Sequence, residues 1–367
     1  MDNLQEKYSL DTQHYRVGDN TYYNFFQALD EEKRTGHFVQ YELDPELIDS
    51  LQGLKKPTNL SREYIKNLMI KGLKKLRKEH NNLRLCLGGG TDSWTILKVC
   101  VENDIFLDEV ATGLVSLKGS VRPDLEYLPG VKYAKRFEGK QIGTVKAITP
   151  TLDDLNYVND PEWYKKTPGC ILPPRPWFNH YYHQELKDPA WMNIVGKSKP
   201  SFEFKDGKVS LCHLDGVTAE YMGYRVVNFF CDKNNPELLV AMSYQLLDNL
   251  PKETFRKNHW FQVESIKDNQ LTIKILEALG MKTPHAWLNL HFLGKKSYDQ
   301  NLKTKYFNKE LHKLGLGWFE TKYKESLLDI YNQYKDLPYA VEKQGDCVKS
   351  IGRWSQKVPI LQDKFGG

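Results

Sequence analysis

The chain has 367 residues, of which 40% are hydrophobic and 12% aromatic, and its formal net charge is +5. This length and composition predict a globular protein with a large core, organised as two domains or as one large domain with additions. No stretch reaches the roughly 18 apolar residues of a membrane-spanning helix, and the first residues do not resemble a signal peptide, so we expect a soluble, cytoplasmic protein without a membrane partner. The mild positive charge suits phosphate-rich ligands but does not require nucleic acid.

The six cysteines are scattered along the chain and form no Cys-x-x-Cys pair. This spacing argues against a zinc ribbon and against a disulfide framework. We therefore expect reduced thiols.

The first 80 residues predict a small mixed element followed by a helix. Residues 1–60 are expected to form an α+β element, because an aromatic cluster precedes the alternating stretch 36–43. Residues 61–80 are expected to form a basic amphipathic helix, with Ser61 as its N-cap and Glu63 in its first turn. Its lysines are those of a solvated helix face.

The most informative stretch is a strand, a glycine turn and the start of a helix between residues 83 and 100. Residues 83–87 are a short apolar run, typical of a buried strand. Asp92 and Ser93 are good N-cap types for the helix that follows. Glycines let a backbone approach a ligand closely, and the first N–H groups of a helix lack partners inside it, so the stretch predicts a phosphate site. The candidate site residues are Gly88, Gly89, Gly90, Thr91, Asp92 and Ser93.

This turn does not match two common phosphate loops. A Walker loop needs a lysine directly after its last glycine, whereas the next lysine here is Lys98. The dinucleotide fingerprint needs glycine at the position of Ser93. An acidic residue in a phosphate cradle requires a cation between the two charges, so Asp92 is predicted to bind Mg²⁺ together with phosphate oxygens. A structural glycine turn without a ligand is the alternative interpretation.

The hexapeptide Gly-Gly-Gly-Thr-Asp-Ser at residues 88–93 resembles the Ser-Gly-Gly-x-Asp-Ser loop of the PP-loop ATP pyrophosphatases. This superfamily, which is adenine nucleotide alpha hydrolase-like, includes the C-terminal synthetase domain of asparagine synthetase, the 7-cyano-7-deazaguanine synthases and the tRNA thiolation enzymes. In that family the loop holds the β- and γ-phosphates of ATP, which is cleaved between its α- and β-phosphates. The first serine of the family is Gly88 here, and the missing hydroxyl is expected to cost about 1 kcal/mol of binding unless another donor replaces it.

The order of a basic helix and a glycine-loop strand also resembles PP-loop proteins of large tailed phages, which would place the protein in the cytoplasm of a host cell. The glutaminase domain of asparagine synthetase has no counterpart here, because no cysteine precedes Cys86 and the N-terminal segment is too short. A nitrogen donor would therefore be free ammonia, an amine substrate or a partner.

The chain after residue 100 continues with a β-α-β pattern. Residues 106–115 and 142–148 are expected to be strands, joined by a crossover helix at 125–137. This order predicts the α/β class with a doubly wound parallel sheet of Rossmann type, which is the fold that the resemblance implies. Because nucleotides bind at the carboxyl ends of such strands, Thr112 is a candidate adenine or ribose contact, the alternative being a plain strand end.

Residues 149–190 are irregular and rich in aromatic side chains, which predicts a lid over the site. Asp153 and Asp154 are candidate ligands of a second metal, or else cap a helix or face solvent. His180 and His183 are spaced to share one helical face and chelate a metal, and one of them is a candidate general base.

Residues 191–200 are expected to form a further strand that ends in a basic loop at Gly196. If this strand lies beside residues 83–87, its end faces the phosphate loop. Lys197 or Lys199 would then neutralise the departing pyrophosphate. A lysine-rich surface turn is the alternative.

An inserted hairpin and a helix are expected next. Residues 201–211 alternate around an Asp-Gly turn, which predicts a hairpin, and residues 226–230 are expected to pair with it. A helix is predicted at residues 236–250, with proline in its first turn.

The segment 251–367 is expected to be mostly helical, best supported at 270–279 and 321–334. Its interleaved basic and aromatic residues resemble a nucleic-acid surface, and helical core aromatics with solvated lysines are the alternative. The predicted organisation is a small N-terminal element at 1–60, a PP-loop-like α/β domain at 61–250, and this C-terminal region.

The resemblance implies an ATP-dependent, AMP-forming enzyme. Asp92 with Mg²⁺ would order the triphosphate, and the N–H groups of residues 89–93 with the Ser93 hydroxyl would hold its end. A carboxylate or amide oxygen of a small-molecule or nucleobase acceptor would attack the α-phosphorus, and ammonia, an amine or sulfur would displace the adenylate. The alternatives are a catalytically degenerate ATP-binding or nucleic-acid-binding protein, and a modifier of a base in DNA or tRNA. The sequence indicates no oligomeric state.

Overall fold

The computed structural model describes a series of segments. Together they contain two large hydrophobic cores, described below, and Gly88 at the start of the glycine turn. No helix within them is long and apolar enough to span a membrane. The described residues are 14–22, 24–42, 45–52, 54–88, 91–113, 116–117, 120–121, 127–148, 153–166, 188–196, 201–205, 208–212, 225–248, 259–261, 309, 311–337, 341–344, 347–350 and 358–361.

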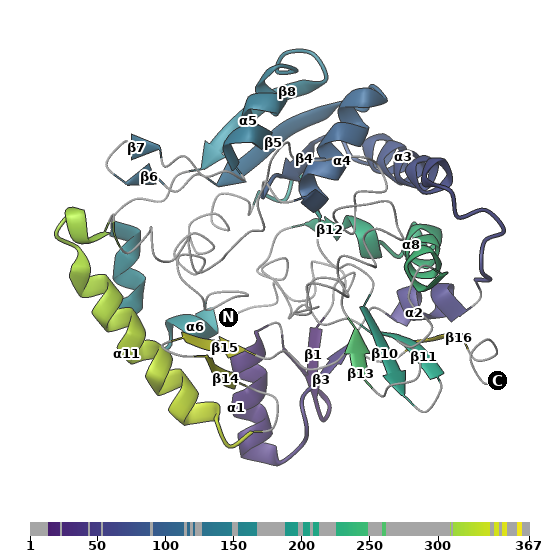
Figure 1. Cartoon of the computed structure of the whole chain (residues 1–367). Helices are drawn as coiled ribbons and strands as arrows, with labels where there is room; N and C mark the ends of the chain where they lie inside the picture. The colour runs from purple at the N-terminus through teal and green to yellow at the C-terminus, as the bar shows by residue number, and fades with distance from the viewer. Residues whose placement is uncertain are drawn as a thin grey trace.

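A parallel five-stranded sheet forms the centre of the α/β part (Figure 1). The strand order is β12-β9-β4-β5-β8, and every neighbouring pair is parallel. The first of these strands in the chain is therefore central, with the next two on one side and the last two on the other, which is the order of a doubly wound sheet. The predicted α/β class is confirmed. The strands are β4 (Leu83–Cys86), β5 (Leu107–Gly113), β8 (Ile142–Ile148), β9 (Met192–Val195) and β12 (Val226–Asn228).

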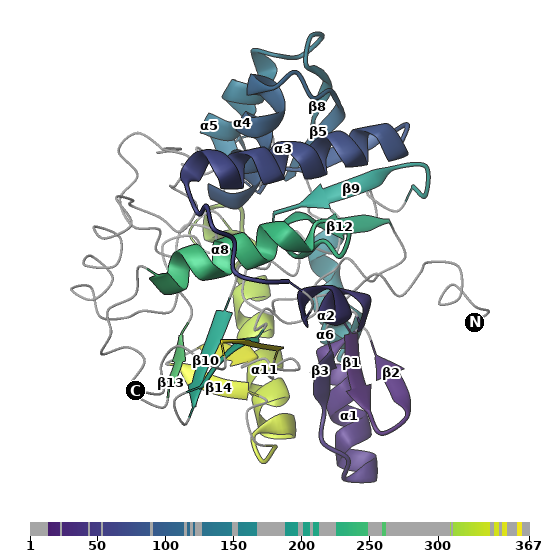
Figure 2. The same ribbon diagram turned by 90° about the vertical axis from the view of Figure 1, so that its right-hand side faces the viewer.

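Alternation along β4 assigns its side chains to the two faces of the sheet. Leu83, Leu85 and the following Leu87 are at most 1% exposed and belong to the main hydrophobic core. Four of the described helices that contribute to the same core lie on this face, and three of them are seen beside the sheet in Figure 2. They are α3 (Arg62–Glu79), α4 (Thr91–Glu102), α5 (Tyr127–Lys135) and α8 (Pro236–Asp248).

The helix predicted at residues 61–80 is α3, and its expected cap is present. The hydroxyl of Ser61 accepts a hydrogen bond from the N–H of Tyr64 at 3.2 Å. On α4, by contrast, the helix begins at Thr91, so the predicted caps Asp92 and Ser93 lie within the first turn. The difference is one or two residues, which is the usual uncertainty of a helix boundary.

A buried ion pair lies on the opposite face of the sheet. The Arg84 Nε lies 2.5 Å from a carboxylate oxygen of Glu109 on β5, and a second nitrogen of the guanidinium donates to Asn193 on β9 at 3.2 Å. The guanidinium also stacks on the ring of Trp191, 4.4 Å from its centroid. Since Arg84 and Glu109 are 3% and 8% exposed, neither charge is solvated by bulk water.

We expect Glu109→Gln to lower the free energy of unfolding by about 3–5 kcal/mol, because it leaves the buried guanidinium without its counter-charge. Urea denaturation followed by circular dichroism measures the change. Glu102→Gln is the control: it breaks the exposed i,i+4 pair with Lys98 on α4 and should cost less than about 0.5 kcal/mol. Equal midpoints for the two variants would contradict a stabilising role for the buried pair.

The predicted hairpin is confirmed, but its expected third partner is wrong. β10 (Ser201–Lys205) and β11 (Lys208–Cys212) pair antiparallel over five positions. Residues 226–228 instead form β12, which pairs in parallel with β9 in the main sheet. A short apolar run fits either kind of sheet, so its partner is decided by tertiary packing. The hairpin is flanked by two strands that were not predicted, β13 (His259–Phe261) and β16 (Val358–Leu361).

The described residues of the N-terminal segment form three strands and two helices. The strands form one antiparallel sheet in the order β2-β1-β3, and α2 contributes Leu47 and Leu51 to the main core. The elements are β1 (His14–Val17), β2 (Asn20–Tyr22), α1 (Phe25–Thr35), β3 (Gln40–Glu42) and α2 (Pro45–Gln52).

A second hydrophobic core combines segments that are distant in the sequence. It contains residues of α1, of the 3-10 helix η1 (Asp153–Asn159), of α6 (Trp163–Lys166) and of α11 (Gly317–Tyr334). In Figures 1 and 2 these helices lie on the side of the molecule away from α3, α4 and α5. The predicted helix at 321–334 is part of α11, whereas the predicted helix at 270–279 lies outside the described residues. The hairpin of β14 (Val341–Gln344) and β15 (Cys347–Ser350) follows α11.

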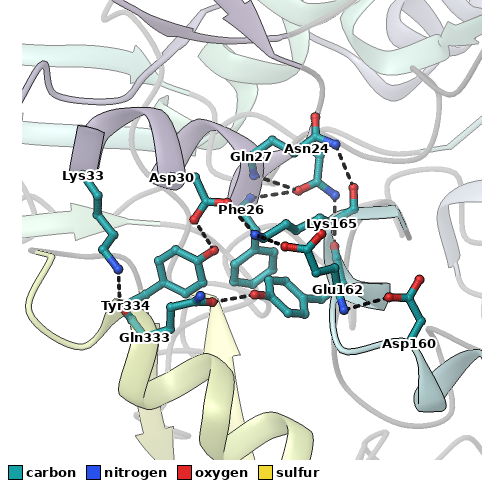
Figure 3. A network of polar contacts seen from close by, with 11 residues as sticks. Asn24, Phe26, Gln27, Asp30, Lys33, Asp160, Glu162, Lys165, Gln333 and Tyr334 are labelled. Atoms are coloured by element: carbon teal, nitrogen blue, oxygen red, sulfur yellow. Dashed lines mark hydrogen bonds and ion pairs between the residues drawn. The ribbon is translucent and has the colours of Figure 1, made fainter. Parts of the chain in front are cut away.

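Polar contacts join α1, α6 and α11 in this second core (Figure 3). The Tyr334 hydroxyl on α11 donates to Asp30 on α1 at 2.7 Å, and Lys165 on α6 pairs with the same carboxylate at 2.7 Å. Burial lowers the pKa of Lys165, but hydrogen bonds to Asp30 and Glu162 raise it by more, so the amine stays charged. The part of the predicted lid at residues 153–166 is thus built into a core, and a lid over the glycine turn would have to come from the rest of residues 149–190.

Asn24 ties the start of α1 to α6 in Figure 3. Its Oδ1 accepts from the N–H groups of Phe26 and Gln27 at 2.9 and 3.2 Å, and its Nδ2 donates to the Tyr164 carbonyl at 3.0 Å. We expect Asn24→Ala to cost about 2–3 kcal/mol of unfolding free energy, and Asn24→Ser, which keeps a capping oxygen, about 1 kcal/mol. Urea denaturation compares them, and a serine variant as unstable as the alanine variant would assign no stability to the cap.

Candidate functional site

The candidate site lies at the carboxyl edge of the parallel sheet, where the strand order reverses. β4 and β9 are parallel neighbours with Cys86 beside Val195, so Gly88 and Gly196 follow their strands at the same edge. The predicted strand at 191–195 is confirmed as β9, and its place beside β4 meets the condition on which the predicted role of Lys197 and Lys199 depends. In open α/β sheets, ligands bind in the crevice at such a reversal point, because the following segments diverge there.

The predicted strand before the glycines and the predicted helix after them are confirmed. β4 ends at Cys86 and α4 begins at Thr91. Ser93 is 6% exposed in the first turn of α4, and its hydroxyl accepts a hydrogen bond from the Gly88 N–H at 3.2 Å. The structure therefore brings together two of the predicted site residues, Gly88 and Ser93.

The residue before the turn is held by β5. The N–H of Leu87 donates to the Ala111 carbonyl at 2.7 Å, and the Leu87 carbonyl accepts from the Thr112 hydroxyl at 2.9 Å. Thr112 is fully buried, and its predicted contact with adenine or ribose stays a prediction. On the side-chain side, Leu87 contacts α5 so closely that a Cβ at Gly130 would lie 3.1 Å from its Cδ2. The sequence did not predict these roles of Thr112 and Gly130. No local pattern identifies a hydrogen-bond partner 25 residues away or a packing contact with another element.

Several predicted site residues are placed only in part. Thr91 and Asp92 occupy the first two positions of α4, with their side chains outside the description. Asp153 and Asp154 are the first two residues of η1, and the structure likewise describes only their backbone. Outside the described residues altogether are Gly89, Gly90, Lys197, Lys199, His180 and His183.

In the described part of the chain, Cys100 is not a reactive thiol and no preformed metal cluster is present. Cys100 on α4 is fully buried, and burial raises the pKa of its thiol, which keeps it protonated and unreactive. None of the described residues Cys86, Cys100 and Cys231 forms a disulfide. Within the ranges given above, no three His, Cys, Asp or Glu side chains gather closely enough to hold a metal ion.

No family model and no curated protein matches this chain. The family resemblance therefore rests on the hexapeptide at residues 88–93 and on its place in the fold.

The structure has room for the family's serine at Gly88. Among the described residues, the nearest neighbour of a Cβ there would be Ser93 Oγ at 4.0 Å, and Gly88 does not adopt a positive φ. We expect Gly88→Ser to change the unfolding free energy by less than about 0.5 kcal/mol. If ATP binds as proposed below, the added hydroxyl should raise its affinity about fivefold.

Gly143→Ala is the control for this substitution. A Cβ at Gly143 on β8 would lie 2.5 Å from the Asp108 carbonyl oxygen, so the variant should lose about 2 kcal/mol or more. Thermal unfolding gives the stabilities and calorimetry the ATP affinity. A destabilised Gly88→Ser protein with normal Gly143→Ala stability would contradict the packing described at both glycines.

Proposed function

We propose that this chain is an ATP-dependent, AMP-forming enzyme of the PP-loop ATP pyrophosphatase type. It would adenylate a carboxylate or amide oxygen, release pyrophosphate and pass the activated group to ammonia, an amine or sulfur. The observation that carries the proposal is the place of residues 88–93, which follow the central parallel strand and lead into the first turn of α4 at the reversal point of the sheet. A glycine turn in that setting directs unpaired N–H groups toward an anion.

The residues present are compatible with one Mg²⁺. Asp92 is the second residue of α4, where a carboxylate is stabilised by the helix dipole. Mg²⁺ usually takes only one or two protein carboxylates and completes its shell with phosphate oxygens and water, so a single aspartate is sufficient. The ion would neutralise charge on the triphosphate oxygens.

The chain's own groups would act mainly by positioning. N–H groups of residues 89–93 and the Ser93 hydroxyl would hold the terminal phosphates. The acceptor oxygen would attack the α-phosphorus, and the bond to the bridging oxygen would break so that pyrophosphate leaves with the electron pair. The adenylate would then lose AMP to the nucleophile. Lys197 and Lys199 follow the end of β9, which lies beside β4, and would balance the charge of the leaving pyrophosphate.

We expect Asp92→Asn to weaken Mg²⁺-dependent ATP binding at least tenfold, about 1.4 kcal/mol, because the cation loses its protein ligand. Calorimetry with and without Mg²⁺ measures the affinity, and pyrophosphate release with a panel of carboxylate and amide acceptors measures the reaction. Glu102→Gln, at the other end of α4, should change neither. A wild-type protein that binds no ATP, or an Asp92→Asn protein that binds it equally well, would overturn the proposal.

Gly88 favours a second candidate, a nucleotide-binding protein without chemistry, because the family's serine hydroxyl is missing there. ATP binding without pyrophosphate release from any acceptor would support this reading. Binding of DNA or RNA that weakens steeply with salt would assign the partner to nucleic acid.

A further inference from the structure

Two hydroxyl groups hold opposite ends of one peptide unit at the entrance to the glycine turn. The Leu87 carbonyl accepts from the Thr112 hydroxyl at 2.9 Å, and the Gly88 N–H donates to the Ser93 hydroxyl at 3.2 Å. This carbonyl and this N–H belong to the same planar peptide group. The two hydrogen bonds therefore fix the orientation of that plane.

The two holding residues come from different elements and are shielded from water. Thr112 lies on β5 and is 0% exposed, and Ser93 lies on α4 and is 6% exposed. Loss of either hydroxyl would leave a carbonyl or an N–H group without its partner in a site that water reaches poorly, which is costly. The neighbouring N–H of Leu87 is also fixed, by the Ala111 carbonyl at 2.7 Å.

A fixed plane at this point matters because three glycines follow. Glycine has the greatest backbone freedom, so the direction in which the chain enters the turn strongly influences where the later N–H groups point. A site that binds an anion through N–H groups gains affinity when these groups are oriented before the ligand arrives.

We propose that Thr112 is a positioning residue that, together with Ser93, clamps the Leu87–Gly88 peptide and so orients the glycine turn for its ligand. The identity of that ligand, a nucleoside triphosphate, rests on the proposed function. The clamp itself is a property of the free protein. Thr112 acts through Leu87 and needs no contact with the ligand.

The test compares Thr112→Val, which keeps the shape and removes the hydroxyl, with Thr112→Ser, which keeps the hydroxyl. Thr144→Val is the matched control, because the Thr144 hydroxyl also donates to a carbonyl of β5, that of Asp108, at 3.4 Å near the opposite end of the strand. Two measurements are made on each folded protein. Hydrogen exchange by NMR reports the Gly88 amide without ligand, and calorimetry reports the dissociation constant for ATP with Mg²⁺.

We expect Thr112→Val to accelerate exchange of the Gly88 amide about tenfold and to weaken ATP binding about fivefold to tenfold, as the loss of one buried hydrogen bond predicts. Thr112→Ser should stay within about twofold of the wild type in both measurements, and Thr144→Val should change neither. Rescue by serine separates a role of the hydroxyl from a general effect of a buried substitution.

The outcomes separate the clamp from the proposed function. Wild-type protein that binds no ATP overturns the proposed function. The exchange rate of the Gly88 amide then tests the clamp by itself. Unchanged Gly88 exchange in Thr112→Val, or equal effects of the serine and valine variants, overturns the clamp. If Thr112→Val does not fold, hydrogen exchange is measured on Ser93→Ala instead. A Gly88 amide that is as protected in Ser93→Ala as in the wild type would also overturn the clamp.

Discussion

The pairing of β4 with a parallel neighbour on each side is the constraint on which the candidate site depends. The registers place Ala111 of β5 and Val195 of β9 beside Cys86, so three strands end at one edge of the sheet. The chain proceeds in one direction from β4 to β5 and returns on the other side at β9. With this order, the connections after β4 and after β9 are expected to diverge. The glycine turn follows β4 at that point of the sheet edge. The same hexapeptide in a surface loop would lack both the rigid strand and the divergence.

The side chains on the sheet face opposite the four helices explain why this register is fixed. Arg84 faces Glu109 across the β4–β5 pair, and a one-residue slip would turn one charge into the hydrophobic core and leave the other unpaired. One step closer to the turn, the charged pair gives way to a small buried cluster that includes Cys86, Ala111 and Val195. The ion pair thus specifies which residues meet at the carboxyl edge, and apolar side chains fill the same face next to the start of the turn.

Local patterns predicted most of the elements of the α/β part, because they depend on contacts within a few residues. The strand at 142–148 and the capped helix after Ser61 need only alternation, helical spacing and a hydroxyl at the right place. Contacts between distant segments could not be predicted in this way. Nothing near residue 226 indicates β9 as its partner, and Tyr334 and Asp30, which hydrogen-bond across the second core, are 304 residues apart. The candidate site follows the same division. The glycine turn could be predicted from local sequence, whereas the Thr112 hydroxyl that holds its entrance comes from another strand.

The clamped peptide also changes how Gly88 should be understood. Its N–H is already used by Ser93, so the first peptide of the turn supports the backbone and does not face a ligand as a donor. In the proposed function, the anion would then be bound by the N–H groups that follow, those of residues 89–93, at the positive end of the α4 dipole. No described residue comes closer than 4.0 Å to a Cβ at position 88, so a serine there would add a donor without a clash with the described part of the chain. The glycine therefore removes one contact from the site while leaving intact the geometry that makes the site possible.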